Sequence, residues 1–253
     1  MLFAEYAADL AALVGPIADG AVLETAAGTG VVTRELREVL PGSSRLTATD
    51  LNPEMLDVAR EHVGDGVELL GADATALPFG EGEFDAVVCQ FGVMFFPDEA
   101  GGYREAARVL KPGGRFVLSV WDDLARNGIP GCLQEVFASL WPEDPPRFLQ
   151  TPYRPLEMTK MLRDLQAAGF GEVRIRVLPK ACRVASAVEA VETLLQSSPA
   201  GVELAQRERT EDGREAAVRA LAERFAAGDP SRPFAAPMQA VVFEAVVAGA
   251  AGV

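Results

Sequence analysis

The chain has 253 residues, 49% of them hydrophobic, which is the composition of a globular protein rather than a disordered one. Its net charge is −14 at pH 7, so it would repel the phosphates of DNA or RNA and an anionic lipid surface. Its three cysteines lack CxxC spacing, which argues against a zinc site or a disulfide framework and indicates a reducing, cytoplasmic setting.

The N-terminal stretch MLFAEYAADLAALVG has the pattern of an amphipathic helix. It carries acidic residues where a signal peptide carries Lys or Arg. Apolar runs elsewhere in the chain fall short of the roughly 20 residues that cross a bilayer. We therefore expect no membrane span.

The first half of the chain alternates between short apolar runs and helical patterns. A helix is expected at 31–40, a second one starts at Asn52-Pro53, and Asp98 can cap a third. Apolar runs predict five strands at 21–25, 45–49, 67–70, 84–90 and 115–120. Between the last helix and the last strand, the sequence KPGG predicts a turn.

The second half is less regular. Residues 122–152 indicate a partly helical connection. Further helices are expected at 159–168, 189–196 and 215–226, and strands at 172–178 and 238–247. We expect residues 183–229 to form a helical lid, inserted between the last two strands, that covers the active site.

Strands that alternate with helices predict a doubly wound α/β fold whose parallel strands are joined by right-handed crossovers. Residues 1–122 would form the cofactor-binding core, and residues 123–253 the remainder of the same domain. In such open sheets, ligands bind beyond the carboxyl ends of the strands. The polar motifs that follow all fall in strand-to-helix loops of this kind.

The first of these loops, ETAAGTG, lies between a strand and a helix, where glycines let the backbone approach a ligand. A dinucleotide fingerprint GxGxxG would require glycine at position 33, which is Thr33. Glu24 ends the strand, and its carboxylate would repel a phosphate but suit a cationic ligand. The loop therefore matches a nicotinamide or flavin site only in part.

Two aspartates follow later strands. Asp50 comes after the second strand, where a carboxylate can accept both hydroxyls of a ribose; the alternative is an acid stabilised by the start of the next helix. Its distance from Gly30 along the chain favours the ribose. Asp73 can accept from an adenine amino group beside the Ala74 backbone N–H, or it can cap its own loop.

Four segments are informative together: VLETAAGTG, TATDLNPEML, GADATALPF with FDAVV four residues later, and VLKPGGRFVLSVW. This set resembles the class I S-adenosylmethionine-dependent methyltransferases, in particular the branch related to ubiquinone and menaquinone biosynthesis. The resemblance is close over residues 4–122, and the tail looks like the family's last helix and closing hairpin. It implies a Rossmann-like sheet of seven strands with the last strand antiparallel.

The resemblance assigns cofactor contacts to matching positions. Glu24 matches the acid that faces the methionine amino group. Ala26, Gly28 and Gly30 occupy the glycine positions of the first motif. The family usually has glycine where Ala26 stands, but a methyl group is a small perturbation that should leave binding intact.

The remaining contacts follow the later strands. Asp50 matches the ribose acid with Leu51 beside the adenine, and Asp73 and Ala74 match the pair at the adenine edge. The chain begins later than this branch leads us to expect, so part of the N-terminal lid is expected to be missing. Three further positions line the methionine and the transferable methyl or close over the cofactor: Gln90, Phe91 and Tyr6.

The implied activity is methyl transfer from S-adenosylmethionine to a small-molecule acceptor, with S-adenosylhomocysteine as product. Methyl transfer from a sulfonium is an in-line displacement that requires alignment and exclusion of water, so no catalytic side chain is obligatory. Apolar residues beyond the strand ends predict a partly apolar acceptor, whose pocket would be lined by Met94, Phe95 and Trp121.

Four further titratable residues could have a chemical or a structural role. His62 is expected to be a solvated helix residue, Cys89 a core thiol, and Asp122 and Asp123 either substrate ligands or caps.

A nicotinamide-dependent oxidoreductase of the same architecture and a cofactor-binding module without catalysis are the alternative functions. The methyl acceptor, the methylated atom and the oligomeric state cannot be predicted from the sequence.

Overall fold

The computed structural model describes residues 4–196, 199–207 and 210–249. The chain divides into two compact units. Unit 1 comprises residues 1–120, 157–176 and 241–253, and unit 2 comprises residues 121–156 and 177–240. Strands β6 and β7 each contribute residues to both units, and so does β5 with its last residue, so neither unit is a continuous stretch of sequence.

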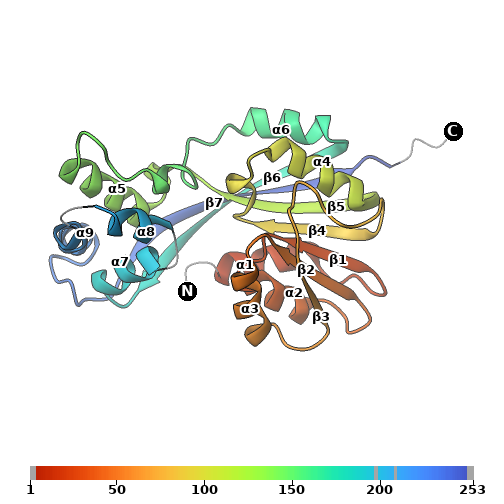
Figure 1. The fold of residues 1–253 in the computed structure, drawn as a ribbon, viewed down its shortest axis with the longest axis horizontal. Coiled ribbons are helices and arrows are strands. Elements are labelled where there is room, and N and C mark those ends of the chain that lie inside the picture. The colour runs from red at the N-terminus through yellow and green to blue at the C-terminus, as the bar shows by residue number, and fades with distance from the viewer. Residues whose placement is uncertain (1–3, 197–198, 208–209, 250–253) are drawn as a thin grey trace. The chain divides into compact units, whose positions relative to one another are not determined.

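Helices and strands alternate through unit 1, as the sequence predicts (Figure 1). The strands are β1 Ala21–Thr25, β2 Arg45–Asp50, β3 Val67–Gly71, β4 Phe84–Gln90, β5 Leu110–Trp121, β6 Phe170–Val184 and β7 Phe234–Val247. The helices are α1 Ala4–Val14, α2 Val31–Val39, α3 Pro53–His62, α4 Glu99–Val109, α5 Gly128–Leu140, α6 Met158–Ala167, α7 Ala187–Gln196, α8 Pro199–Ala205 and α9 Thr210–Phe225. Short 3-10 turns lie at η1 Val93–Phe95, η2 Leu124–Arg126 and η3 Phe148–Gln150.

Within the described residues, seven strands form one sheet in the order β3-β2-β1-β4-β5-β7-β6. The first five strands in this order, β3, β2, β1, β4 and β5, pair in parallel with their neighbours. Ala248, just after β7, donates to the carbonyl of Gly169, just before β6, so these two strands run antiparallel. The predicted α/β fold with a late antiparallel strand is confirmed.

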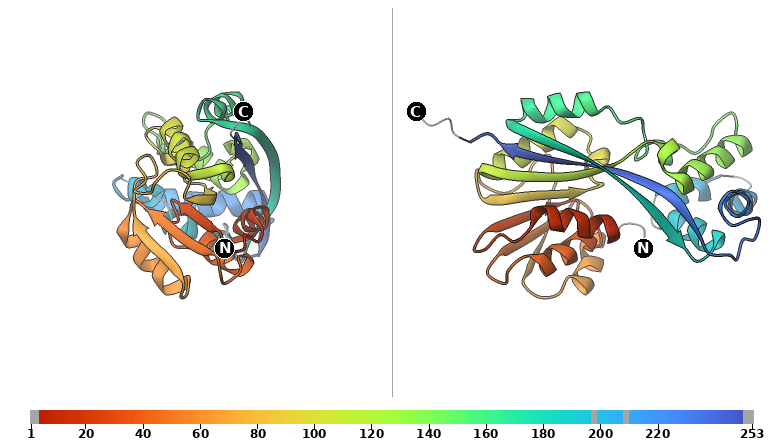
Figure 2. Two further views of the ribbon diagram at one scale, coloured as in Figure 1. Left: turned by 90° about the vertical axis from the view of Figure 1, so that its right-hand side faces the viewer. Right: turned by 180° about the vertical axis from the view of Figure 1, so that it is seen from behind.

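Helices cover both faces of the sheet in unit 1. Arg115 of β5 donates to the carbonyls of Leu13 and Val14 at the end of α1. The next residue, Phe116, contacts Tyr103 of α4. Because consecutive side chains of a strand point to opposite faces, α1 and α4 lie on opposite sides of the sheet, which Figure 2 shows from two further directions.

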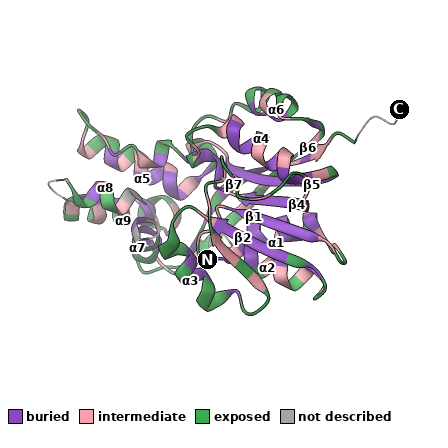
Figure 3. Ribbon diagram, turned by 45° about the vertical axis from the view of Figure 1, so that its right-hand side comes forward, coloured by how far each residue is buried: buried purple, intermediate pink, exposed green. Residues whose placement is uncertain are grey.

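The central strands are the most deeply buried. All residues of β1 are buried, and so is most of β4, as Figure 3 shows. Strands covered by helices on both faces have near-continuous apolar sequences, and for this reason both were predicted with their observed bounds.

Strand β5 differs from the prediction. It begins at Leu110 instead of residue 115, because the KPGG segment continues the strand after a shift in its pairing with β4. Gly113 adopts a left-handed backbone at φ 79° within this irregular stretch. The segment is therefore a bulge within the strand, where the sequence predicts a turn before it.

Strands β6 and β7 are also longer than predicted. The added residues of β6 are mostly exposed or half-buried, so no apolar alternation marks them in the sequence. The helical insertion before the last strand is confirmed as α7, α8 and α9, and α9 packs against α5 and α7 within unit 2. Residues 197–198 and 208–209 of the predicted lid lie outside the described residues. The covering role of the lid and the boundary at residue 122 stay predictions.

Candidate cofactor site

Polar side chains gather on one face at the carboxyl ends of neighbouring strands. Glu24 of β1 pairs in register with Ala48 of β2 and Val88 of β4. Asp50 and Gln90 each lie two residues beyond those partners, so they share the face of Glu24. The three predicted strand-end residues therefore come together as the sequence indicates.

The loop after β1 bends through three left-handed residues: Ala26 at φ 53°, Gly28 at φ 55° and Gly30 at φ 80°. A Cβ on Gly28 would meet no atom within 4 Å, so this backbone faces open space that a ligand can approach. A Cβ on Gly30 would lie 2.5 Å from Val63 Cγ1 and 3.1 Å from Ala59 Cβ. Gly30 is therefore required for close packing of the loop against α3.

Ala26 holds a backbone conformation that favours glycine, and a second glycine accommodates its methyl group. A Cβ added to Gly92 would lie 2.5 Å from the Ala26 Cβ and 2.8 Å from Cys89 Sγ. Gly92 thus makes room for the alanine where the family usually has glycine. Nothing in the sequence alone marks this pairing, because the two residues are far apart in the chain.

Asp50 ties the first loop to the second. Its Oδ2 accepts a hydrogen bond of 2.8 Å from the Gly28 N–H, and its Oδ1 accepts one of 2.8 Å from the Asn52 N–H. Both oxygens keep a second lone pair for a ligand hydroxyl. The next residue, Leu51, is a large apolar side chain that is 74% exposed, and its position beside an adenine stays a prediction.

Glu24 is a buried acid. Its side chain is 1% exposed, and its Oε2 accepts a 2.5 Å hydrogen bond from the hydroxyl of Thr33 in α2. Burial raises the pKa of Glu24 to about 8; the Thr33 hydroxyl lowers it, and the nearby charge of Asp50 raises it. The sequence reveals Thr33 only as a missing glycine and gives no sign of this contact.

Tyr6 and Phe91 meet edge to face. Their ring centroids lie 5.7 Å apart at an interplanar angle of 80°. Phe91 has a left-handed backbone at φ 55°, and its N–H donates to the Ser119 carbonyl over 2.9 Å. The predicted N-terminal residue thus contacts the residue that follows β4, next to Gln90.

Asp73 is partly committed to its own loop. Its Oδ1 accepts hydrogen bonds from the Thr75 N–H and hydroxyl, at 2.8 and 2.7 Å, and these bonds lower the pKa of Asp73. This is the local capping that the sequence left open as an alternative. The role of Asp73 and Ala74 at an adenine edge stays a prediction.

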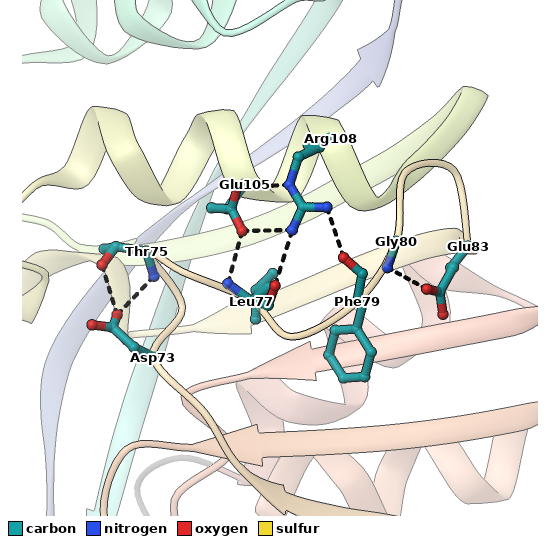
Figure 4. Close-up of polar contacts among 8 residues, drawn as sticks. All are labelled: Asp73, Thr75, Leu77, Phe79, Gly80, Glu83, Glu105 and Arg108. Atoms are coloured by element: carbon teal, nitrogen blue, oxygen red, sulfur yellow. Dashed lines mark hydrogen bonds and ion pairs between the residues drawn. The ribbon is translucent and has the colours of Figure 1, made fainter.

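The rest of the loop between β3 and β4 is held by two residues of α4 (Figure 4). Glu105 accepts from the Leu77 N–H at 2.7 Å, and Arg108 donates to the carbonyls of Leu77 and Phe79 at 3.0 and 2.7 Å. Glu105 and Arg108 also form an ion pair at 2.7 Å. The helix therefore fixes the backbone of the loop that carries Asp73, a contact that the sequence does not predict.

The predicted acceptor residues fall in both units. Met94 is buried in η1, whereas its neighbour Phe95 is 48% exposed. Trp121 belongs to unit 2, where its ring lies 5.7 Å from that of Tyr153. The common pocket of Met94, Phe95 and Trp121 stays a prediction.

Other titratable candidates have structural roles. His62 is exposed, and its Nδ1 lies 2.7 Å from the Val58 carbonyl of its own helix. Cys89 is buried, and burial raises the pKa of its thiol to about 11. Asp123 caps η2 by accepting from the Arg126 N–H, and Asp122 Oδ2 accepts from the Gln239 side chain at 2.6 Å.

Among the described residues, no cluster of His, Cys, Asp and Glu side chains could hold a metal ion. No helix in the same part of the chain combines the length and the hydrophobicity that a membrane span requires.

The donor set of this face fits S-adenosylmethionine. A buried acid faces the strand ends where an ammonium group would bind, and a second acid retains acceptor capacity for ribose hydroxyls. The open side of Gly28 leaves room for a ligand beside the loop, and the exposed Leu51 offers an apolar surface to a base.

Comparison with known proteins agrees with this assignment. Residues 23–118 match the model of a methyltransferase domain family. Over 109 residues the chain is 37% identical to the ubiquinone/menaquinone biosynthesis C-methyltransferase UbiE of Hahella chejuensis, covering 41% of this chain and 44% of the relative. Over 133 residues it is 40% identical to the demethylmenaquinone methyltransferase of Clavibacter sepedonicus, covering 50% and 53%. The chain thus spans about half the length of the curated relatives it matches.

Solved structures share the fold at low sequence identity. The YcgJ protein of Bacillus subtilis matches with a TM-score of 0.63 and 16% identity, covering 97% of this chain and all of the other. A phosphoethanolamine N-methyltransferase of Haemonchus contortus, solved with S-adenosylmethionine, matches with a TM-score of 0.59 and 18% identity, covering 96% and 52%. Residues 23–118 are therefore similar to methyltransferase domains, and the chain shares the fold of these solved structures.

Proposed function

We propose that the protein binds S-adenosylmethionine at the carboxyl ends of β1, β2 and β4 and transfers its methyl group to a small-molecule acceptor. The observation that carries this proposal is the hydrogen bond between the loops after β1 and β2. The Gly28 N–H donates to Asp50 over 2.8 Å, next to the buried Glu24. This arrangement presents one acid to an ammonium group and another to a ribose.

The geometry supports a separate role for each of three acids. Glu24 would accept from the amino group of the methionine moiety, directly or through water. Asp50 would accept from the ribose hydroxyls while its bonds to Gly28 and Asn52 hold its orientation. Asp73 has its Oδ1 bonded to Thr75, so its Oδ2 is the oxygen that we assign to the adenine amino group, with the Ala74 N–H beside it.

The residues after β4 would line the reacting end of the cofactor. Tyr6 packs on Phe91, so these rings would close the site around the methionine moiety and exclude water, with Gln90 beside them. When bound, S-adenosylmethionine supplies a methyl group on a sulfonium, which is already activated for transfer. The protein therefore contributes alignment and exclusion of water, and it needs no general base when the acceptor atom is nucleophilic.

For the acceptor we propose an electron-rich aromatic ring of the quinol class. Relatives at 37% and 40% identity are named for ubiquinone/menaquinone biosynthesis and for demethylmenaquinone. Phe95 follows β4 and is 48% exposed, which is an apolar surface suited to such a ring. The proposed setting is the cytoplasm, which the three free thiols support.

The acceptor proposal is tested by transfer of labelled methyl groups. S-adenosylmethionine with a radioactive methyl group is incubated with the protein and a short-chain demethylmenaquinone, once reduced to the quinol and once left oxidised. We expect label in the extracted quinone only with the reduced ring. A carbon of the electron-rich quinol supplies the electron pair to the methyl group, the bond from sulfur to that methyl group breaks, and the ring proton that is replaced goes to the solvent. We expect Phe95→Ala to lower the transfer rate at least several-fold and to leave the affinity for S-adenosylhomocysteine unchanged.

Two results would count against this choice of acceptor. Equal labelling with the reduced and oxidised rings would exclude methylation at a ring carbon. Absence of labelling with either ring, in protein that binds S-adenosylhomocysteine, would exclude the quinol class and leave the cofactor assignment intact.

A further inference from the structure

Thr33 and Glu24 form a closed pair inside unit 1. The Thr33 side chain is 0% exposed and that of Glu24 is 1% exposed. Their 2.5 Å hydrogen bond joins the first turns of α2 to the end of β1. The strand is held from its other side as well, since the Thr49 hydroxyl donates to the Glu24 main-chain carbonyl at 3.1 Å. These two bonds fix the position of Glu24. The effect of the Thr33 hydroxyl on the charge of Glu24 can therefore be tested by substitution.

Among the described residues, the groups that act on Glu24 include no positive charge. The groups with an electrostatic or hydrogen-bonding influence are Asp50 on β2, Thr33 on α2 and the Cys89 thiol on β4. Asp50 disfavours a second negative charge, and the buried thiol offers none to offset it. A buried carboxylate in such surroundings pays a large desolvation cost, so the free protein holds Glu24 as the neutral acid near pH 7.

An ammonium group of a ligand would make the ionised form of Glu24 more stable than the neutral form. A positive charge against the carboxyl favours its ionised form, and the Thr33 hydroxyl then donates to a carboxylate, which is the stronger type of hydrogen bond. Binding would therefore release the Glu24 proton to the solvent and leave an ammonium–carboxylate pair with Thr33 as its third member.

We propose that Thr33 is a positioning residue for cofactor binding, which holds Glu24 in place and favours the loss of its proton when the ammonium group of the cofactor arrives. The inference rests on the proposed function, because it requires a ligand with an amino group at Glu24. Beyond that function, it makes the affinity for this ligand depend on the release of the Glu24 proton. Thr33 of α2 sets the pH range in which this dependence is observed.

The test is calorimetric titration with S-adenosylhomocysteine in buffers of different ionisation enthalpy, from pH 6 to pH 9. For the wild-type protein we expect release of close to one proton at pH 7 and an affinity that rises about tenfold per pH unit below pH 8. Glu24→Gln should release no proton from this site and should lose most of this pH dependence.

Thr33→Val and Thr33→Ser form the matched pair of variants. Removal of the hydroxyl in Thr33→Val should weaken binding roughly tenfold at pH 7, as expected for one charge-assisted hydrogen bond, and the loss should shrink towards pH 9. Thr33→Ser keeps the donor and should restore both the affinity and the pH profile. Circular dichroism checks that each variant is folded, and should Thr33→Val not fold, the comparison of wild type with Glu24→Gln still decides the proton release.

The outcomes separate this inference from the proposed function. A wild-type protein that binds S-adenosylhomocysteine without proton release would overturn the inference and leave the function standing. An equal loss of affinity at every pH in Thr33→Val would assign Thr33 a purely structural role and would also overturn it. A wild-type protein that does not bind S-adenosylhomocysteine at any pH would overturn the proposed function, and the inference with it.

Discussion

Ala26 and Gly92 are coupled by one methyl group. Ala26 has a left-handed backbone, which costs a residue with a Cβ about 1–2 kcal/mol. Its methyl group occupies the space in which a Cβ on Gly92 would lie at 2.5 Å. The departure from the usual glycine at position 26 is thus accommodated by a glycine elsewhere, and the two positions should not vary independently.

A double-mutant cycle tests this coupling. Gly92→Ala should lower the free energy of unfolding by about 1–3 kcal/mol, the usual cost of an overpacked site. In the Ala26→Gly background the cost should fall by about 1 kcal/mol, because only the contact with Cys89 Sγ at 2.8 Å remains. Urea denaturation of the four proteins measures the coupling, and additive effects would show that the two positions are independent.

At the scale of elements, α4 fixes the loop between β3 and β4. Arg108 satisfies two main-chain carbonyls of this loop, and Glu105 satisfies one N–H. The Arg108–Glu105 ion pair itself is worth little because both side chains are partly exposed to solvent. Arg108 therefore stabilises the protein mainly through its hydrogen bonds to the loop backbone, which hold the segment that carries Asp73.

Arg108→Met should lower the free energy of unfolding by about 2 kcal/mol through the loss of these bonds. It should also weaken S-adenosylhomocysteine binding several-fold, because the loop that carries Asp73, the residue proposed to bind the adenine, loses its support. Arg104→Met is the matched control on the same helix: Arg104 pairs with the exposed Asp98, at 2.9 Å, and its loss should change neither quantity. Thermal denaturation and calorimetry measure the two effects, and similar results for both variants would exclude a specific role for Arg108 in holding this loop.

The elements also show where sequence patterns suffice. Strands β1 and β4 were predicted to the residue because burial on both faces leaves an apolar run. Glu24 and Asp50 lie at the ends of β1 and β2, and Gly28 follows β1, so their meeting could be inferred from strand order and register. The partners of these residues could not, because Thr33, Gly92 and Arg108 act through tertiary contacts with no local signature. The extension of β6 was missed because an exposed strand lacks apolar alternation.

At the scale of the whole molecule, one buried acid makes stability depend on pH. The pKa of Glu24 is raised from 4.5 to about 8 in the folded protein, so the folded state keeps a proton that the unfolded chain releases between these values. The folded state then binds more protons than the unfolded one, and the free energy of unfolding falls as pH rises. This contribution is fully present below pH 4.5 and is lost as pH rises through about 8.

Glu24→Gln should remove this dependence, because the amide stays neutral and can still accept from Thr33. The difference in unfolding free energy between variant and wild type should grow in favour of the variant from pH 5 to pH 8.5, by a few kcal/mol at most. Other titrating groups are common to both proteins and cancel in the difference. Urea denaturation across this range is the measurement, and a difference that does not change with pH would contradict the assignment of a neutral Glu24.

The central claim is that the loops after β1 and β2 form a site for S-adenosylmethionine. The most direct measurement is calorimetric titration of the wild-type protein, Asp50→Ala and Asp57→Ala with S-adenosylhomocysteine and, separately, with NAD. Asp57 is the control, since it is an exposed aspartate of α3 that pairs with Arg60 at 2.6 Å. We predict that S-adenosylhomocysteine binds to the wild type and to Asp57→Ala with equal affinity, that Asp50→Ala weakens this binding at least tenfold, and that NAD does not bind. Binding of NAD in place of S-adenosylhomocysteine would identify a nicotinamide site and contradict the account, and binding of S-adenosylhomocysteine that is indifferent to Asp50→Ala would place the cofactor elsewhere.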